Sequence, residues 1–252
     1  MYKGALLDLD DTLFPTSRYV AQALTASVRS MIEAGLPTNS DEGLERLLGI
    51  RKGIGTNASN HFDLLVQSYG INPAPPRIVQ AGVAAYHSQR ENLLVPQQEA
   101  TDFLDTLAKE DFRSAVVTTG LEGKQWFKLV RMGVVPYFID RHEDGSVHEH
   151  VYVLPDGATT DQRDELVRRA IDEREINPSR SFVVDDKTKW IVAGKKAGIQ
   201  YGFRIRRGSH QDEPYPIDVP SRYKEDDQVE TLYDLLRILR EIGLIRHVHH
   251  PA

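Results

Sequence analysis

The sequence predicts an α/β fold, a Rossmann-like parallel sheet with an inserted all-helical cap domain, and three observations lead to it. An apolar strand over residues 3–9 is followed by helical periodicity alone up to residue 95. From residue 96 on, strand and helix patterns alternate, as in a parallel sheet covered by helices. Polar residues follow several strands, at the edge where such sheets bind ligands. We therefore expect a core domain of residues 1–15 and 96–252 and a cap domain of residues 16–95.

The elements of the cap domain follow from apolar residues at helical spacing. The first helix covers residues 20–32 and stops at Gly35. Further helices are expected over residues 44–50, after Ser59 as an N-cap, and over residues 78–86. We expect this helical domain to cover the site at the end of the first strand.

The core domain is expected to alternate helices and strands. Short apolar runs bounded by Gly, Pro or polar residues predict the strands, and apolar residues three and four apart predict the helices. In chain order these are a helix over 103–107, a strand over 114–118, a helix over 120–130, a strand over 137–139, a helix over 166–171, a strand over 181–184, a helix over 191–197, a strand over 200–205 and a helix over 232–242.

Histidines stand out in two other segments. Residues 146–154 alternate as in a β-hairpin, with His148 and His150 on one face. Since no third ligand is in view, we interpret them as ordinary exposed strand histidines rather than as metal ligands. Three more histidines lie beyond the last helix, in a tail over residues 247–250 that we expect to be disordered.

The composition argues against several classes of protein. The 252 residues include 31 basic and 37 acidic side chains, a net charge of −6 without a basic block, which argues against nucleic-acid binding. There is no cysteine, so disulfides and thiolate chemistry are excluded. No apolar stretch approaches the ~20 residues of a membrane span. We therefore expect a cytoplasmic protein without membrane or nucleic-acid partners, whose oligomeric state the sequence leaves open.

The first strand ends in a cluster of carboxylates, Asp8, Asp10 and Asp11. Because side chains alternate between the two faces of a strand, Asp8 and Asp10 point the same way. Two carboxylates in a small space favour a cation between them or a proton on one of them. Magnesium prefers such oxygen ligands together with a phosphate, so we expect a small phosphate ester as the substrate. The structural alternative is a polar turn after an ordinary strand.

Residues 8–13, Asp-Leu-Asp-Asp-Thr-Leu, resemble the first motif of the haloacid dehalogenase superfamily, which is Asp-x-Asp-x-Thr after an apolar strand. The resemblance implies that Asp8 attacks phosphorus and that Asp10 acts as acid and base. It also implies that both contribute to a magnesium site, Asp10 through its main-chain carbonyl. Asp11 is expected to belong to the turn that follows.

Two later segments carry the resemblance further. Thr118 and Thr119 end a strand before a helix, in the position of the second motif, which implies that they bind phosphate through a hydroxyl and backbone amides. Asp185 ends a later strand in the position of the fourth motif, which implies another magnesium ligand. Asp186 either supports that ligand or caps the next helix.

The third motif departs from the superfamily. Relatives carry a lysine upstream of the fourth motif, whereas residues 159–163 contain none. Arg163 is the nearest cation there, and we expect it to bind phosphate, although its planar fork differs from an ammonium. Lys187 and Lys189, just after the fourth motif, are the alternatives.

The resemblance spans almost the whole chain. Residues 31–37, 61–63, 124–129 and 204–208 look like the corresponding segments of archaeal-type subfamily I members known as glyceraldehyde 3-phosphate phosphatases. This resemblance implies a magnesium-dependent phosphatase for a small phosphate monoester of the sugar or triose phosphate class, acting through an aspartyl-phosphate. Two alternatives stay open, a phosphomutase and a binding or regulatory protein of this fold that lost turnover with the third-motif lysine.

Overall fold

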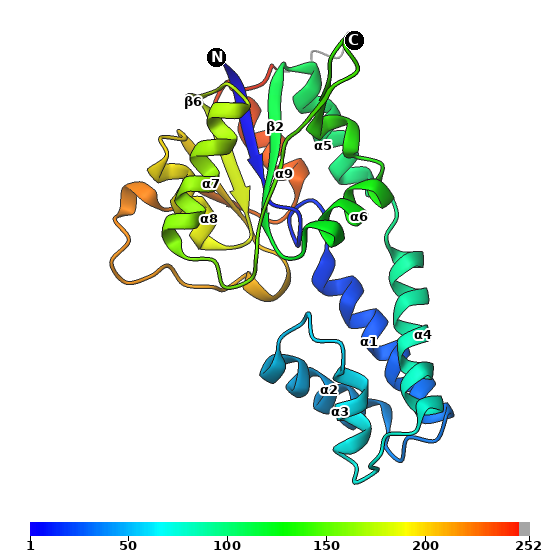
Figure 1. Cartoon of the computed structure of the whole chain (residues 1–252). Helices are drawn as coiled ribbons and strands as arrows, with labels where there is room; N and C mark the ends of the chain where they lie inside the picture. Colours follow the sequence, from blue (N-terminus) through cyan, green and yellow to red (C-terminus); the bar gives the residue numbers. More distant parts are fainter. Residues whose placement is uncertain (247–252) are drawn as a thin grey trace, which may run out of the picture. The chain divides into compact units, whose positions relative to one another are not determined.

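The computed structural model describes residues 1–246 and divides the chain into two compact units. The first unit is formed by Met1–Ser17 together with the chain from Pro96 on, and the second is Arg18–Val95 (Figure 1). No helix in the described part of the chain is both long enough and apolar enough to span a membrane.

The first unit contains a six-stranded sheet in the order β5-β2-β1-β6-β7-β8. Every pair of neighbouring strands in it is parallel, so the predicted parallel sheet is confirmed. The carboxyl-terminal halves of the two central strands, residues 4–7 and 181–185, are buried at every position and so lie between the two helical layers. The strands are β1 (Tyr2–Leu7), β2 (Phe112–Thr119), β5 (Val151–Leu154), β6 (Ile176–Asp185), β7 (Tyr201–Ile205) and β8 (Asp227–Val229).

Helices cover both faces of this sheet (Figure 1). On one face, Leu6 and Val183 share a buried cluster with Trp190 and Val167. On the other, the Phe103 and Phe182 rings meet edge to face, with centroids 6.3 Å apart. The helices of this unit are α5 (Gln98–Lys109), α6 (Glu122–Met132), α7 (Thr160–Glu173), α8 (Thr188–Lys196) and α9 (Leu232–Glu241).

The second unit is built from helices around its own apolar core, in which Leu24, Met31, Leu47 and Leu65 are buried together. The helices are α1 (Thr16–Glu33), α2 (Ser40–Ile54), α3 (His61–Gln67) and α4 (Pro76–Leu93). The predicted N-cap at Ser59 is wrong, because α3 begins one residue later, after Asn60.

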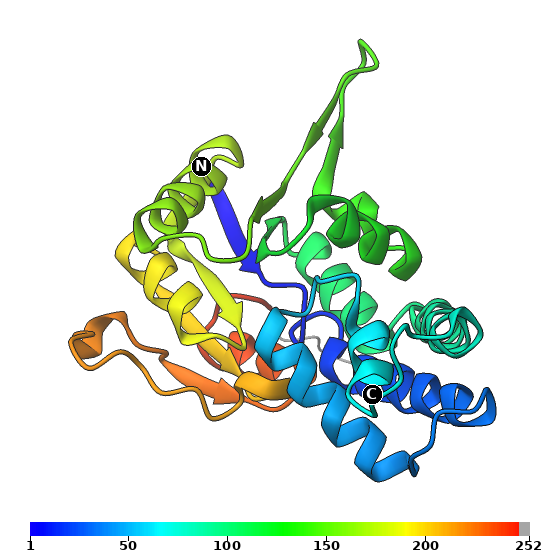
Figure 2. The ribbon, with the colours of Figure 1, turned by 60° about the horizontal axis from the view of Figure 1, so that its bottom comes forward.

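The segment before β5 differs from the prediction. Residues 137–139 do not form a strand of the main sheet, because a 3-10 helix, η1 (Val135–Phe138), leads into β3 (Ile139–Arg141). β3 pairs with β4 (Val147–Glu149) in an antiparallel hairpin that projects as a narrow arm (Figure 2). The predicted hairpin over residues 146–154 is therefore also wrong, since β4 belongs to this arm whereas β5 joins the main sheet.

His150 connects the arm to the main sheet. Its backbone N–H donates to the Phe138 carbonyl at 2.8 Å, and its carbonyl accepts from the Val116 N–H at 2.9 Å. Its ring is buried, with Nε2 3.0 Å from Asp140 Oδ2, while His148 is exposed. The expectation of exposed histidines is therefore confirmed for His148 and wrong for His150, whose ring packs at the base of the arm. The predicted histidine tail, residues 247–250, lies outside the described residues.

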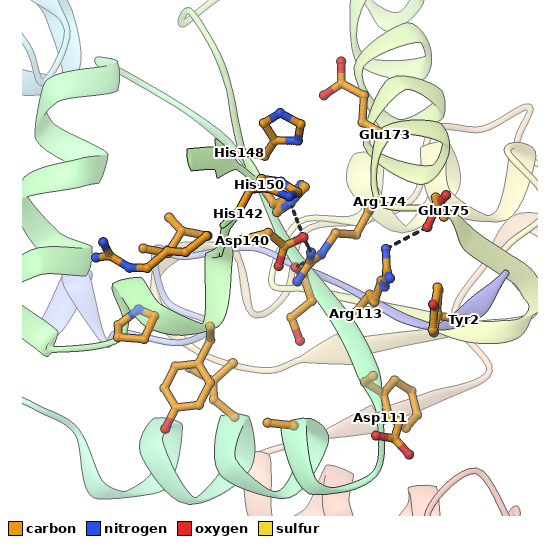
Figure 3. A pocket seen from close by; sticks show the side chains of 18 of the residues that line it. Tyr2, Asp111, Arg113, Asp140, His142, His148, His150, Glu173, Arg174 and Glu175 are labelled. Carbon is orange, nitrogen blue, oxygen red and sulfur yellow. Dashed lines mark hydrogen bonds and ion pairs between the residues drawn. The ribbon is translucent and has the colours of Figure 1, made fainter. Parts of the chain in front are cut away.

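A cavity of about 970 Å³ lies at the edge of the sheet where β1, β2 and β6 begin (Figure 3). Asp140 and Arg174 point toward one another across it and form an ion pair, and Arg113 pairs with Glu175 at 2.9 Å. Arg174 also donates through Nε to the Ser114 carbonyl at 3.1 Å. Because these charges pair with each other, we interpret the cavity as a structural junction between the arm and the sheet.

The junction makes stability depend on pH. Burial and the Arg174 charge lower the pKa of His150, although Asp140 acts in the opposite direction. The unfolded chain therefore binds a proton at this histidine at higher pH than the folded chain does. The His150 contribution to stability is complete above the ordinary imidazole pKa and is lost as the pH falls below it.

We expect His150→Gln to remove this part of the pH dependence. Urea unfolding at about pH 7.5 and about pH 5.5 should give a smaller difference in unfolding free energy for the variant than for the wild type. His148→Gln, on the exposed side of the same arm, is the control and should behave as the wild type. An unchanged difference in His150→Gln would contradict this interpretation.

Candidate active site

Three neighbouring strands bring the motif residues together at their carboxyl ends. β1 lies between β2 and β6, so Asp8, which follows β1, lies between Thr118 on β2 and Asp185 on β6. The Asp8 N–H donates to the Val184 carbonyl at 3.1 Å, which extends the pairing of β1 with β6 to the site. The predicted convergence of the first, second and fourth motifs is thus present in the structure.

Asp8, Asp185 and Asp186 form a buried acidic cluster. Each offers a carboxylate oxygen, and these oxygens all lie within 4.8 Å of one another. Within residues 1–246, four oxygens of the cluster have no hydrogen-bond partner: both oxygens of Asp8, Oδ2 of Asp185 and Oδ2 of Asp186. Unpartnered carboxylates are costly to bury, and oxygen-only donors at this spacing suit a hard divalent cation. The cluster therefore fits such an ion.

The pKa values of the cluster reflect the same crowding. Burial raises the pKa of Asp8 to about 7, with repulsion from Asp186 and Asp10 adding to the rise and Lys187 opposing it. Burial, followed by repulsion from Asp8, raises the pKa of Asp185 well above its ordinary value. Positive charge beside these groups is needed to keep them ionised near neutral pH.

Lys187 brings a positive charge to this cluster. Its Nζ lies 3.2 Å from Asp186 Oδ1 and 3.9 Å from Asp8 Oδ2. Its backbone N–H donates to Asp185 Oδ1 at 2.7 Å, which fixes the start of the turn into α8. Burial lowers the pKa of Lys187, but the three carboxylates together raise it above its ordinary value. The side chain is therefore a permanent ammonium facing Asp8.

The other two cations considered from the sequence lie differently. Arg163, on α7, is buried with its guanidinium carbon 5.5 Å from the centre of the Trp190 ring, close enough to Asp185 to respond to its charge. Neither Arg163 nor Lys189 forms an ion pair with Asp8 within residues 1–246. Among the three candidates, the structure brings Lys187 to Asp8.

The Asp10 carboxylate belongs to a second set of contacts. Lys128 Nζ and the Thr16 hydroxyl both donate to its Oδ1, and Gln125 Nε2 donates to its Oδ2 at 3.3 Å. Burial raises the pKa of Asp10, but attraction to Lys128 and the three donors outweigh it, so the pKa lies below its ordinary value. Lys128 and Gln125 were not predicted as site residues.

Asp11 closes the turn after the first motif. Its backbone is left-handed, with φ of 61°, and its Oδ1 accepts from the Ser17 N–H at 2.8 Å. A Cβ at Gly208 would lie 2.2 Å from Asp11 Oδ2, so only glycine allows this close approach. Asp11 thus has contacts typical of a turn residue.

Comparisons with known proteins agree with the geometry. The model of the haloacid dehalogenase-like hydrolase family matches residues 5–203. A glyceraldehyde 3-phosphate phosphatase of Methanopyrus kandleri is 34% identical to this chain and covers 96% of it and 99% of itself. One of Pyrococcus furiosus is 27% identical over 98% of this chain and 97% of its own length.

Solved structures support the fold. A HAD family hydrolase from Deinococcus radiodurans with bound phosphate and sodium has a TM-score of 0.59 at 19% identity and covers 97% of each chain. A putative HAD-hydrolase from Bacillus subtilis bound to magnesium has a TM-score of 0.57 at 18% identity, over 94% of this chain and 98% of its own. The motifs, the parallel sheet and these relatives agree: the chain belongs to the haloacid dehalogenase-like hydrolase family and is a phosphoric monoester hydrolase.

Proposed function

We propose that the protein is a magnesium-dependent phosphatase that hydrolyses a small phosphate monoester of the sugar or triose phosphate class through an aspartyl-phosphate on Asp8. The observation that carries this proposal is the buried Asp8 carboxylate facing the Lys187 ammonium at 3.9 Å, beside two further carboxylates. The relatives named glyceraldehyde 3-phosphate phosphatases support the substrate class.

The acidic cluster is the proposed magnesium site. Asp8 and Asp185 would hold the ion through their carboxylates and Asp10 through its main-chain carbonyl, and Asp186 lies close enough to contribute. When bound, magnesium would offset negative charge on the phosphoryl oxygens. The unpartnered oxygens of the cluster support this assignment.

In the proposed reaction, Asp8, Asp10 and Lys187 have different roles. One Asp8 oxygen attacks phosphorus as the bond to the leaving oxygen breaks. Asp10, which must first take up a proton because its pKa lies below the ordinary value, gives that proton to the leaving oxygen. Water then attacks the phosphoryl group, its proton passes to Asp10, and the bond between Asp8 and phosphorus breaks. Lys187 attracts the substrate dianion and stabilises ionised Asp8.

The remaining predicted residues have supporting roles in this proposal. Thr118 and Thr119, at the end of β2, bind a phosphoryl oxygen through hydroxyl and backbone N–H groups. We assign the role of the missing third-motif lysine to Lys187 rather than to Arg163, because Arg163 packs over Trp190. Residues 16–95 are proposed as the helical cap domain.

The first test is phosphate release from a panel of phosphate esters that includes glyceraldehyde 3-phosphate, with magnesium. We expect inorganic phosphate without any added acceptor, a result that also separates a phosphatase from a phosphomutase. Asp8→Asn should abolish this activity, because its amide cannot attack phosphorus. Ester binding without turnover in the wild type would instead support a binding protein.

A second prediction distinguishes the catalytic contribution of Lys187 from that of Arg163. Lys187→Met should lower kcat/KM about 10²- to 10³-fold, the usual effect of removing one electrostatic stabiliser. Arg163→Met, the matched control, should lower it less than about tenfold. Circular dichroism would verify that both variants fold. The reverse order of the two losses would assign the role to Arg163.

A third prediction concerns the metal directly. Magnesium should raise the melting temperature of the wild type, because an ion that binds only the folded state stabilises it. Asp185→Asn should lose this rise, whereas Asp161→Asn, exposed in the first turn of α7, should keep it. A full magnesium-dependent rise in Asp185→Asn would contradict the proposed ligand set.

A further inference from the structure

Two side chains of α6 reach the carboxylate of Asp10 from far along the chain. Gln125 and Lys128 are three residues apart, so they lie on the same side of the helix. Lys128 Nζ donates to Asp10 Oδ1 and, at 2.9 Å, to Gln125 Oε1. Gln125 Nε2 lies 3.3 Å from Asp10 Oδ2. The pair therefore contacts both oxygens of this carboxylate.

Gln125 also makes a hydrogen bond to the end of β2. Gln125 Nε2 also donates to the Thr119 carbonyl at 2.8 Å. The next residue, Gly120, has φ of 135°, and a Cβ there would lie 2.7 Å from Gln125 Nε2. The glycine thus leaves the room that Gln125 needs. Through Gln125, the second-motif strand and the Asp10 carboxylate are joined.

These contacts differ from those of an ordinary surface ion pair. The Lys128 side chain is 16% exposed, that of Asp10 is 24% exposed, and Gln125 as a whole is 3% exposed. Exposed pairs contribute little, because water competes and both side chains lose freedom. Here several donors fix one carboxylate, which restricts its rotation.

We propose that Lys128 and Gln125 are positioning residues that hold the Asp10 carboxylate in the orientation from which it transfers a proton to the departing oxygen. This inference rests on the proposed phosphatase function and on the acid and base role of Asp10. Lys128 and Thr16 both donate to Oδ1, and Gln125 donates to Oδ2 at 3.3 Å, so donors to both oxygens fix the plane of the carboxylate.

The proposal makes the effect of Lys128 depend on the leaving group. An alkyl alcohol is a poor leaving group and needs a proton as its bond to phosphorus breaks, whereas p-nitrophenolate leaves readily without one. If Lys128 instead bound the phosphate directly, both kinds of ester would lose the same factor. The ratio of the two losses therefore distinguishes the two roles.

The test measures kcat/KM of wild type and Lys128→Met with glycerol 3-phosphate and with p-nitrophenyl phosphate, both with magnesium. In Lys128→Met, kcat/KM for glycerol 3-phosphate should fall about tenfold to a hundredfold, which is part of the usual contribution of a general acid. For p-nitrophenyl phosphate, kcat/KM should fall less than about threefold, because its leaving group does not need the proton. Lys128→Arg, which retains the charge, should restore part of the lost activity. Lys124→Met, an exposed lysine on the same helix, should match the wild type.

Three results would overturn the proposal. Equal losses with both esters and a raised KM would assign Lys128 to phosphate binding, and no loss with either ester would remove its role. If Lys128→Met does not fold, Gln125→Leu must give the same dependence on the leaving group, and its absence would contradict the inference. A wild type inactive with both esters would contradict the proposed function itself, which is a distinct outcome.

Discussion

The site depends on one electrostatic constraint, the burial of three carboxylates within 4.8 Å of one another. Like charges that close cannot all stay ionised in a dry environment unless positive charge lies among them. The parallel sheet creates the constraint, because the ends of β1 and β6 place Asp8 beside Asp185. Lys187 supplies part of the positive charge that the cluster needs, and the cation proposed for the unpartnered oxygens would supply the rest. The same positive charge that stabilises the cluster would attract a phosphate dianion.

The two motif aspartates have opposite environments although they are two residues apart. Burial raises the pKa of Asp8, whereas Lys128 and its neighbours lower that of Asp10 despite its burial. Asp8 belongs to the cluster at the strand ends, and Asp10 turns toward Thr16 and α6. The tasks proposed for them, attack by Asp8 and proton transfer by Asp10, follow from these positions, since the lowered pKa of Asp10 by itself favours its ionised form.

The sequence predicted the parallel sheet because short apolar runs bounded by turn residues alternate with helical patterns from residue 96 on. It could not decide between Arg163 and Lys187, since that choice depends on where α7 packs and on Trp190 lying beneath the guanidinium. The role of Lys128 was not visible because its contact with Asp10 spans 118 positions. The β3–β4 arm was missed because His150, which bonds to Phe138 of η1 and to Val116 of β2, divides the apparent hairpin.

In the proposed reaction, the Asp8 carboxylate carries the phosphoryl group between the two steps. The most direct measurement is rapid acid quenching of the enzyme during turnover of a phosphate ester with magnesium, followed by mass spectrometry of its peptides. One added phosphoryl group is expected on the peptide that contains Asp8, and none in Asp8→Asn. Phosphate release with an unmodified Asp8, or with the phosphoryl group on another residue, would contradict it.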